Sequence, residues 1–398
     1  MSTKVKNFNL LFMILLMTFT IGQIASIIFV PALPKVTAVF NCTDATIQWS
    51  VSSFMFGLAF SQFVYGPFSD KHGRRITLSI GVMIGLVGTV ICLLAFSPAM
   101  LIIGRLVQGI GLGVGSAMSY VILRDLFVDE ELARYGSILG MLAPAFGGIA
   151  PILGGYLASF FGWRSIFIFL LAYGFLLWIL VTFLLQETKV IDKDKQSNFK
   201  DIVNDFRILL SSKVFLGYTL CTLLAYSGFM AFYTLGPYLL AEFGVSTVAS
   251  GWLLAVSDLA IVVGSAINIM FVVKYGINKM MFIGTALMIL AGCLLLISKL
   301  FGYVNTPQTV IPVFIFAFGA VLNMCNAFSG ALSPFPEVSG TAGGLLSGMQ
   351  ILGGAIGCSI VAILATFDKE TVLSGIYIVL GIITFLALKM ATGKKQKE

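Results

Sequence analysis

The chain has 398 residues, of which 59% are hydrophobic and only 10% are charged. A soluble globular domain carries about 25% charged residues, so this composition excludes a soluble protein and indicates an integral membrane protein. The formal net charge of +7 does not indicate a nucleic-acid partner, because the cations lie in polar stretches between apolar runs, where membrane topology places them.

Twelve apolar runs of about 20 residues are long enough to cross a bilayer. The first is too long for a signal-peptide core and lacks a small-residue cleavage site, so we expect it to be retained as a helix. Most of the 24 Lys and Arg residues lie in alternate loops and near the chain ends, which predicts that both termini are cytoplasmic. The predicted spans are 9–30, 45–65, 75–95, 99–122, 135–158, 164–186, 213–238, 247–270, 279–299, 309–331, 341–366 and 372–390.

The polar run between the second and third spans carries three permanent cations and the only histidine of the chain. Turn-forming and basic residues between two apolar runs predict a short loop on the cytoplasmic side. In the simplest alternative, the cations do no more than hold this loop inside. The run is Gly66-Pro67-Phe68-Ser69-Asp70-Lys71-His72-Gly73-Arg74-Arg75.

A cation lies within the fourth span, because Arg105 is roughly 9 Å from the predicted outer surface. Gln108 and Ser116 fall near the same helix face, so we expect that face to line an internal substrate cavity rather than meet lipid. A fixed cation there can favour ionisation of a nearby acid or attract an anionic substrate. The alternative is that Arg105 extends outward to the membrane surface.

The fifth span contains Pro151, Gly154 and Gly155. Proline removes a backbone hydrogen bond, so we expect a bend in this helix, and the glycines allow close packing against a neighbour. The alternative is that these residues carry no special role, because Gly and Pro are frequent in membrane helices.

The long polar connection from Gln186 to Lys213 divides the chain into halves of nearly equal length. A weak internal repeat supports this division. Trp49 lies 24 residues before Gly73, and Trp252 lies 24 residues before Gly276. Two parallel six-helix repeats around a central path are therefore predicted. The predicted units are an N-terminal half at 1–188, a cytoplasmic linker at 189–212 and a C-terminal half at 213–398.

One acid falls well inside the hydrocarbon, since Asp258 lies roughly 16 Å into the eighth span, near the midplane of a core about 30 Å thick. An ionised carboxylate is costly there, so we expect Asp258 to bind a proton readily. Gly251 and Ser265 lie seven residues on either side and share its face. The alternative is a structural hydrogen bond to a neighbouring helix.

Several other chemistries find no support in the sequence. Five of the six cysteines lie in apolar runs, and neither a disulfide framework nor a metal-ligand spacing follows from them. The alternating glycines from Gly109 to Gly115 miss the spacing of a dinucleotide loop, and no phosphate-binding loop for ATP occurs. We therefore expect no cofactor, no metal and no enzymatic activity.

Two motifs resemble the major facilitator superfamily. The pattern Gly66-x3-Asp70-x2-Gly73-Arg74-Arg75 is similar to its motif A, and Arg105-x2-Gln108-Gly109 is similar to its motif B. Three further phrases resemble the Bcr/CflA group of drug:proton antiporters. They are Pro31-Ala32-Leu33-Pro34, Leu123-Arg124-Asp125-Leu126-Phe127 and Pro336-Glu337-Val338-Ser339-Gly340-Thr341-Ala342.

The chain departs from that group at two positions. The antiporter motif of the fifth helix usually ends Gly-Pro-x-x-Gly-Gly, and this chain has Ala150 in place of the first of these glycines. An aspartate is also common in the first helix, where this chain has Ile27. The usual proton-binding position therefore carries no acid, and proton coupling is assigned instead to Asp258 with Arg105.

The resemblance implies a conformational role for motif A. Asp70 is expected near the start of the eleventh helix, where it would meet the positive end of the helix dipole. Arg74 is expected to pair with Asp125 at the inner end of the fourth helix. Both contacts would hold the halves together when the cytoplasmic side is closed.

Together these features predict an all-α protein that exports small amphipathic compounds by proton-coupled alternating access, a multidrug efflux transporter that confers antibiotic resistance. The alternatives are uptake of a small nutrient by symport or facilitated diffusion, a membrane-embedded enzyme, and a receptor that has lost transport. We expect a monomer in the bacterial inner membrane whose partners are protons, a small-molecule substrate and the lipid bilayer.

Overall fold

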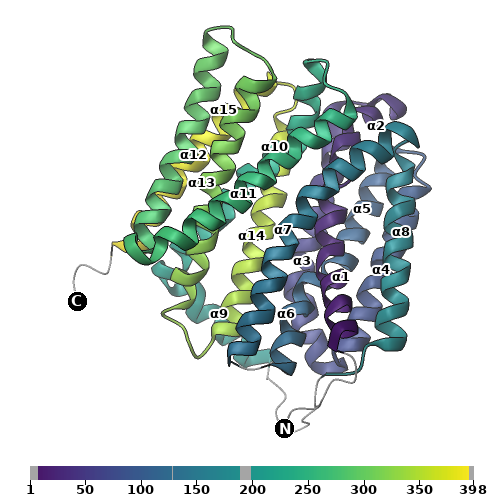
Figure 1. The fold of residues 1–398 in the computed structure, drawn as a ribbon, viewed down its shortest axis with the longest axis vertical. Helices are drawn as coiled ribbons and strands as arrows, with labels where there is room; N and C mark the ends of the chain where they lie inside the picture. The colour runs from purple at the N-terminus through teal and green to yellow at the C-terminus, as the bar shows by residue number, and fades with distance from the viewer. Residues whose placement is uncertain (1–7, 128, 189–198, 394–398) are drawn as a thin grey trace.

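The computed structural model describes residues 8–127, 129–188 and 199–393, and these are almost entirely helical. Twelve helical spans run up and down between two ends (Figure 1). Ten of the described helices are long and apolar enough to cross a membrane. The other two spans are α3 and α7; α3 carries more polar residues, whereas the described apolar part of α7 is short.

The first half contains α1 (Phe8–Ile27), η1 (Val30–Ala32), α2 (Leu33–Phe40), α3 (Asp44–His72), α4 (Arg74–Leu93), α5 (Pro98–Leu112), α6 (Val114–Leu126), α7 (Asp129–Phe160), α8 (Arg164–Ile179) and η2 (Leu180–Leu184). The second contains α10 (Lys213–Glu242), α11 (Thr247–Tyr275), α12 (Ile277–Leu300), α13 (Thr306–Leu332), α14 (Ser339–Ile363) and α15 (Lys369–Thr392). Helix α9 (Phe199–Ser211) lies between them, within the predicted linker.

The polar run between the second and third spans is not the loop that the sequence predicts. Helix α3 continues through Pro67 to His72, and α4 begins at Arg74. The chain reverses at Gly73, whose φ of 91° is readily adopted only by glycine. Gly276 separates α11 from α12 with a φ of 78°, so the internal repeat seen in the sequence is a repeat of backbone geometry.

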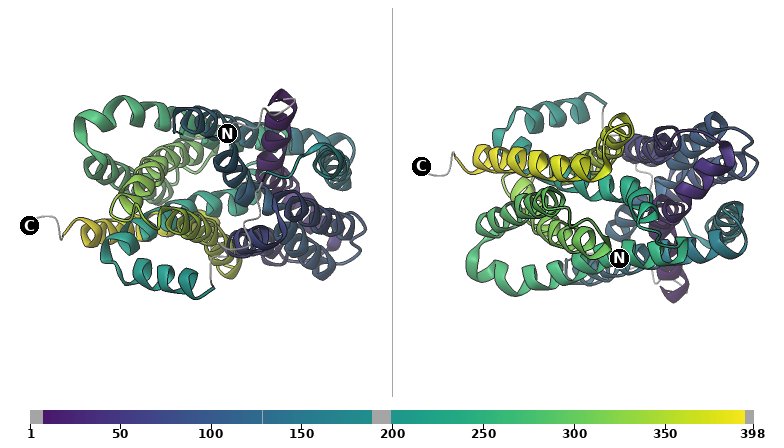
Figure 2. Two further views of the ribbon diagram at one scale, coloured as in Figure 1. Left: turned by 90° about the horizontal axis from the view of Figure 1, so that it is seen from below. Right: turned by 90° about the horizontal axis from the view of Figure 1, so that it is seen from above.

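The halves lie side by side, as the views along the bundle show (Figure 2). The most extensive contacts between them are those of α3 with α14 and of α7 with α11. We call the end where α1 begins and α3 turns into α4 the basic end, after Arg74, Arg75 and Arg124, and the other the opposite end.

Small residues set how closely these helices approach. A β-carbon added at Gly109 would overlap the carbonyl oxygen of Phe54 in α3, and one at Gly111 would overlap the backbone of Gly85 in α4. The alternating glycines of the fourth span are therefore helix-packing positions, as expected where small residues let backbones approach.

Candidate functional site

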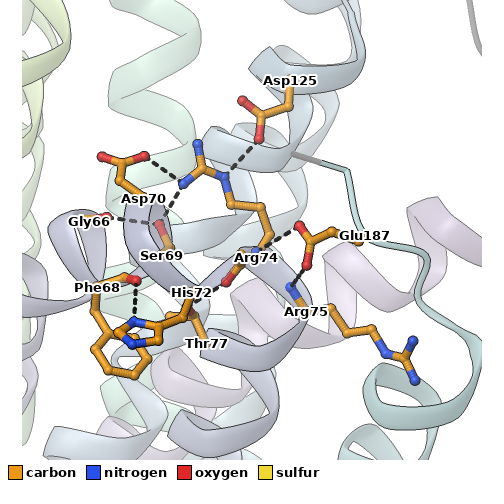
Figure 3. Close-up of polar contacts among 11 residues, drawn as sticks. Gly66, Phe68, Ser69, Asp70, His72, Arg74, Arg75, Thr77, Asp125 and Glu187 are labelled. Atoms are coloured by element: carbon orange, nitrogen blue, oxygen red, sulfur yellow. Dashed lines mark hydrogen bonds and ion pairs between the residues drawn. The ribbon is translucent and has the colours of Figure 1, made fainter. Parts of the chain in front are cut away.

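Arg74 joins two helices at the basic end (Figure 3). Its Nε donates to Asp125 Oδ2 of α6 at 2.8 Å, and its Nη1 donates to Asp70 Oδ1 of α3 at 2.8 Å. The same Nη1 donates to Ser69 Oγ at 2.7 Å. The arginine side chain is only 5% exposed, so one guanidinium fixes the ends of α3 and α6 against the start of α4. The sequence predicts this pairing of Arg74 with Asp125, but both residues belong to the first half, so the contact itself does not join the two halves.

Glu187 completes this cluster from the end of the first half. Its carboxylate accepts hydrogen bonds from the backbone N–H groups of Arg74 at 2.8 Å and Arg75 at 3.2 Å (Figure 3). These donors begin α4 and have no partner within the helix, so the acid caps its positive end. A β-carbon at Gly73 would lie 2.5 Å from Glu187 Oε2. Glycine is required at this turn for its φ, whereas a β-carbon there would only displace the flexible end of the Glu187 side chain.

Arg75 and Gly66 lie on either side of this cluster. The Arg75 guanidinium donates to the carbonyl oxygen of Thr182 in η2, which fixes the last turn of the sixth span. Gly66 supplies the carbonyl oxygen to which Ser69 Oγ donates at 2.8 Å. The turn thus connects four elements of the first half, namely α3, α4, α6 and η2.

An acid does lie at the start of α14, but it comes from the linker. Thr341 Oγ1 donates to Asp205 Oδ2 of α9 at 3.1 Å. Asp70 pairs with Arg74 of α4. The sequence predicted Asp70 near this helix start, and it did not identify Asp205 because α9 was read only as a polar connection.

Arg105 is fully buried in α5 and does not extend to the membrane surface. Its Nη1 donates to the carbonyl oxygen of Ala25 at 2.9 Å and to Gln108 Oε1 at 2.7 Å. The guanidinium carbon lies 4.0 Å from the ring centroid of Phe54 and 5.6 Å from that of Phe29. Neighbouring helices enclose the cation, so the outward-reaching alternative is excluded.

Gln108 and Ser116 belong to two separate hydrogen-bond networks. Gln108 Nε2 donates to Thr89 Oγ1 of α4 at 2.9 Å, so the glutamine links Arg105 to the third span. Ser116 lies in α6 and accepts from Gln62 Nε2 of α3 at 3.0 Å. The structure brings Gln108 to Arg105 but places Ser116 against α3.

Asp258 is 5% exposed in α11 and lies between the halves. Tyr233 of α10 donates its hydroxyl to Asp258 Oδ2. A β-carbon added at Gly148 of α7 would lie 3.4 Å from the Asp258 Cβ. The acid therefore faces the first half across the α7–α11 contact while a tyrosine of its own half holds it.

Ser265 and Gly251 share a face of α11 with Asp258 but have different neighbours. A β-carbon added at Gly251 would overlap the carbonyl oxygen of Pro151 in α7, so this residue faces the first half. Ser265 Oγ lies 4.0 Å from the Cys325 sulfur of α13, within the second half. Only Gly251 therefore shares the interface on which Asp258 lies.

The antiporter-like motif of α7 is a close-packing site. A β-carbon at Gly154 would overlap the carbonyl oxygen of Ile28, and one at Gly155 would lie 2.8 Å from that of Thr247 in α11. Helix α7 itself continues through Pro151. The motif therefore brings the first span and the second half against one helix.

Polar contacts also cross between the halves at the opposite end. Lys369 Nζ of α15 lies 3.4 Å from Asp44 Oδ2 of α3 and 2.6 Å from Glu242 Oε1 of α10. The hydroxyls of Thr37 and Tyr238 are 2.9 Å apart. Among the residues that the structure describes, one ion pair and one hydrogen bond between side chains thus join the halves at this end.

Sequence reasoning missed Glu187, Tyr233 and Lys369. Each acts through a partner more than 20 residues away, and only the packing of the helices brings such pairs together. The signal available for Glu187 was an acid directly after an apolar span. Among the residues that the structure describes, no group of His, Cys, Asp and Glu side chains is placed to hold a metal ion.

The chain is similar to a known family along most of its length. A profile of the Major Facilitator Superfamily matches residues 11–358. Multidrug resistance protein D of Escherichia coli strain K12 is 30% identical over 368 residues, which cover 90% of each chain. A bicyclomycin resistance protein homolog of Haemophilus influenzae is 29% identical over 338 residues, which cover 84% of each chain.

Solved structures show the same fold. The crystal structure of a D-xylose-proton symporter superimposes with a TM-score of 0.76 at 15% sequence identity, covering 97% of this chain and 99% of that one. At this identity the likeness concerns the fold alone, with its twelve spans in two halves.

Proposed function

The chain belongs to the major facilitator superfamily, and from this premise we propose that it is a proton-coupled secondary transporter. It exports small amphipathic compounds by alternating access, and this export gives resistance to antibiotics. The names of the two relatives support the direction of transport and the substrate class. The observation that carries proton coupling is the buried carboxylate of Asp258 at the contact between the halves.

The transporter lies in the bacterial inner membrane as a monomer, with both termini in the cytoplasm. Arg74, Arg75 and Arg124 at the basic end support this orientation, because cations are enriched in cytoplasmic loops. Residues 1–188 and 213–398 are the two moving units, and 189–212 is the linker between them.

Asp258 binds the coupling proton. A carboxylate inside the membrane is costly to ionise, and here the Tyr233 hydroxyl is the hydrogen-bond donor recorded for it. Because Gly148 of the first half covers the acid, a movement of α7 against α11 exposes or encloses it. Protonation is thereby tied to the relative position of the halves.

Arg105 is the second member of the coupling pair. Both charged groups are buried, Arg105 in α5 of the first half and Asp258 in α11 of the second. A change in their separation alters how strongly Arg105 favours the ionised acid.

The cluster around Arg74 is a conformational latch at the cytoplasmic end. Its ion pairs with Asp70 and Asp125 fix the ends of α3 and α6, and α3 is one of the helices that meet the second half at α14. A rigid turn makes α3 move as one body with its half. The latch therefore acts on the balance of conformations rather than on substrate contact.

Transport in proteoliposomes tests the proposal. Purified protein is reconstituted, and ethidium and bicyclomycin are offered with and without an imposed pH gradient. The wild type should concentrate at least one of them against its gradient, and Asp258→Asn should abolish this while leaving binding of a neutral compound intact. Glu131→Gln, which removes an exposed acid of α7, serves as the matched control.

The outcomes separate the rival functions. Accumulation in the same direction as the proton flux would indicate uptake by symport and overturn export. Concentrative transport with intact proton flux in Asp258→Asn would make this acid structural, and Asp70 and Glu337 would be the next acids to examine.

A further inference from the structure

Arg105 has hydrogen-bond donors without an acceptor among the residues that the structure describes. Its side chain is 0% exposed, and both acceptors recorded for it, Ala25 O and Gln108 Oε1, bind Nη1. Nε and Nη2 are buried without an acceptor among the described residues. Buried donors are nearly always paired, and those of a cation inside a membrane are the most costly to leave unpaired.

The helices around this arginine provide no counter-ion. Helix α1, which supplies the Ala25 carbonyl, contains neither Asp nor Glu between Phe8 and Ile27, and the same is true of α5. None of the ion pairs recorded for the described residues includes Arg105. The positive charge is therefore buried without a neighbouring carboxylate from its own half.

The unused donors share one edge of the guanidinium. Nε–H and Nη2–H point in parallel from the same side of the planar group, which is the arrangement that a carboxylate receives with its two oxygens. The Phe54 ring at 4.0 Å covers one face of that plane, and the Nη1 bonds fix its rotation. The edge is thus held in one orientation before any ligand arrives.

Arg105 also lies close to the region between the halves. Its neighbour Phe54 belongs to α3, and α3 packs against α14 of the second half. A ligand held by Arg105 is therefore placed near the second half as well. A substrate of an alternating-access transporter must contact both halves.

We propose that the Nε–Nη2 edge of Arg105 binds the carboxylate of an amphipathic organic acid. The inference rests on the proposed function in one respect, because it takes the ligand to be a transported compound. In the described conformation protein covers the edge, so the acid reaches it when the halves move apart. Phe54 and Phe29 then contact the apolar part of the ligand next to its charged group.

Equilibrium binding to purified protein in detergent tests this assignment without any gradient. The probes are pyrenebutyrate and its neutral methyl ester, which share the apolar body and differ in the carboxylate. The wild type should bind the acid at least about tenfold more tightly than the ester, since a hydrogen bond to a charged group contributes that much or more. Arg105→Lys should lose most of this preference while keeping its affinity for the ester, because an ammonium has no parallel donor edge.

Three comparisons make the result decisive. Arg164→Lys, an equivalent exchange at the opposite end of the first half, should keep the preference for the acid. Glu131→Gln, which removes an exposed acid of the first half, should keep it too. Equal affinities of the wild type for acid and ester would overturn the assignment even if Arg105→Lys does not fold.

The outcomes also separate this inference from the proposed function. The protein could prefer the acid in an Arg105-dependent way and still show no concentrative transport. That result would contradict the export proposal and support the carboxylate site at Arg105. Proton-coupled export together with equal affinities for acid and ester would support the export proposal and contradict the carboxylate site.

Discussion

The ion pair between Lys369 and Asp44 at the opposite end predicts that Lys369→Met increases the population that is open at this end. Lys369 contacts two acids, but only Asp44 belongs to the other half. The variant therefore removes one interaction that must break when the halves separate at this end. The contact to Glu242 stays within the second half and does not depend on that movement.

The size of the effect follows from exposure. The Lys369 side chain is 18% exposed and that of Asp44 is 32% exposed, so water and salt screen the pair. Partly exposed pairs contribute about 0.2–1 kcal/mol. Loss of this pair should therefore raise the ratio of molecules open at the opposite end by about 1.4- to 5-fold. High salt should reduce the difference between variant and wild type.

Spin labels at Phe96 and Tyr303 measure this population. Both side chains are strongly exposed, at 81% and 66%, and they belong to different halves at the same end. Distance distributions from pulsed electron resonance should show a larger long-distance fraction in Lys369→Met. Lys299→Met is the matched control, because Lys299 pairs with Asp368 of its own half. An unchanged distribution in Lys369→Met, or an equal shift in the control, would refute the reasoning.

Three further predictions follow from other parts of the molecule. Asp70→Asn should impair transport but change substrate affinity by no more than a few fold, and a large loss of affinity in folded protein would count against the latch. Gly154→Ala should lower the free energy of unfolding by about 1–3 kcal/mol, because the new methyl group meets the Ile28 carbonyl; in thermal unfolding, Gly375→Ala should cause no loss, since nothing lies within 4 Å of that position. Cys42 should react with an impermeant maleimide from outside intact cells, and slowly at neutral pH: burial and, less strongly, the charge of Asp44 raise the pKa of its thiol, so the reactive thiolate is scarce and labelling should accelerate as pH rises. Labelling only in inverted vesicles, or at a rate independent of pH, would contradict this prediction.

The sequence predicted the helical spans well because their lengths are set by the bilayer and their composition by its apolar core. The polar run after the second span shows where this reasoning failed. Polarity predicted a loop, but α3 continues to His72, where its last turns are held by Arg74 of α4, which donates to Ser69 and Asp70. Side chains that pair locally can extend a helix beyond the apolar run.

The burial of a site residue was predictable where its position along an apolar run, and so its depth in the membrane, determines it. The burial of Asp258 follows from its place in a long apolar run, whereas its donor Tyr233 is 25 residues away and depends on how α10 packs against α11. For Arg105, too, the sequence indicated the depth in the membrane but not the neighbouring side chains. Its distance from the membrane surface allowed an outward-reaching side chain, and only the position of Phe54 and the Ala25 carbonyl reveals that it is enclosed.

The glycine turns of the two halves have a consequence for how the transporter is controlled. Gly73 and Gly276 have nearly the same backbone conformation, but a β-carbon at Gly73 would meet Glu187, while one at Gly276 would find open space. The turn at Gly276 has a different surrounding, because Lys274 and Lys279 lie over the ring of Tyr275 there. A duplicated turn thus has the same shape in both halves while its charged side chains differ. An ion or a modification that acts on carboxylates at the basic end would therefore alter the turn at Gly73 and leave the turn at Gly276 unaffected, so that a pseudo-symmetric transporter can be regulated from one half.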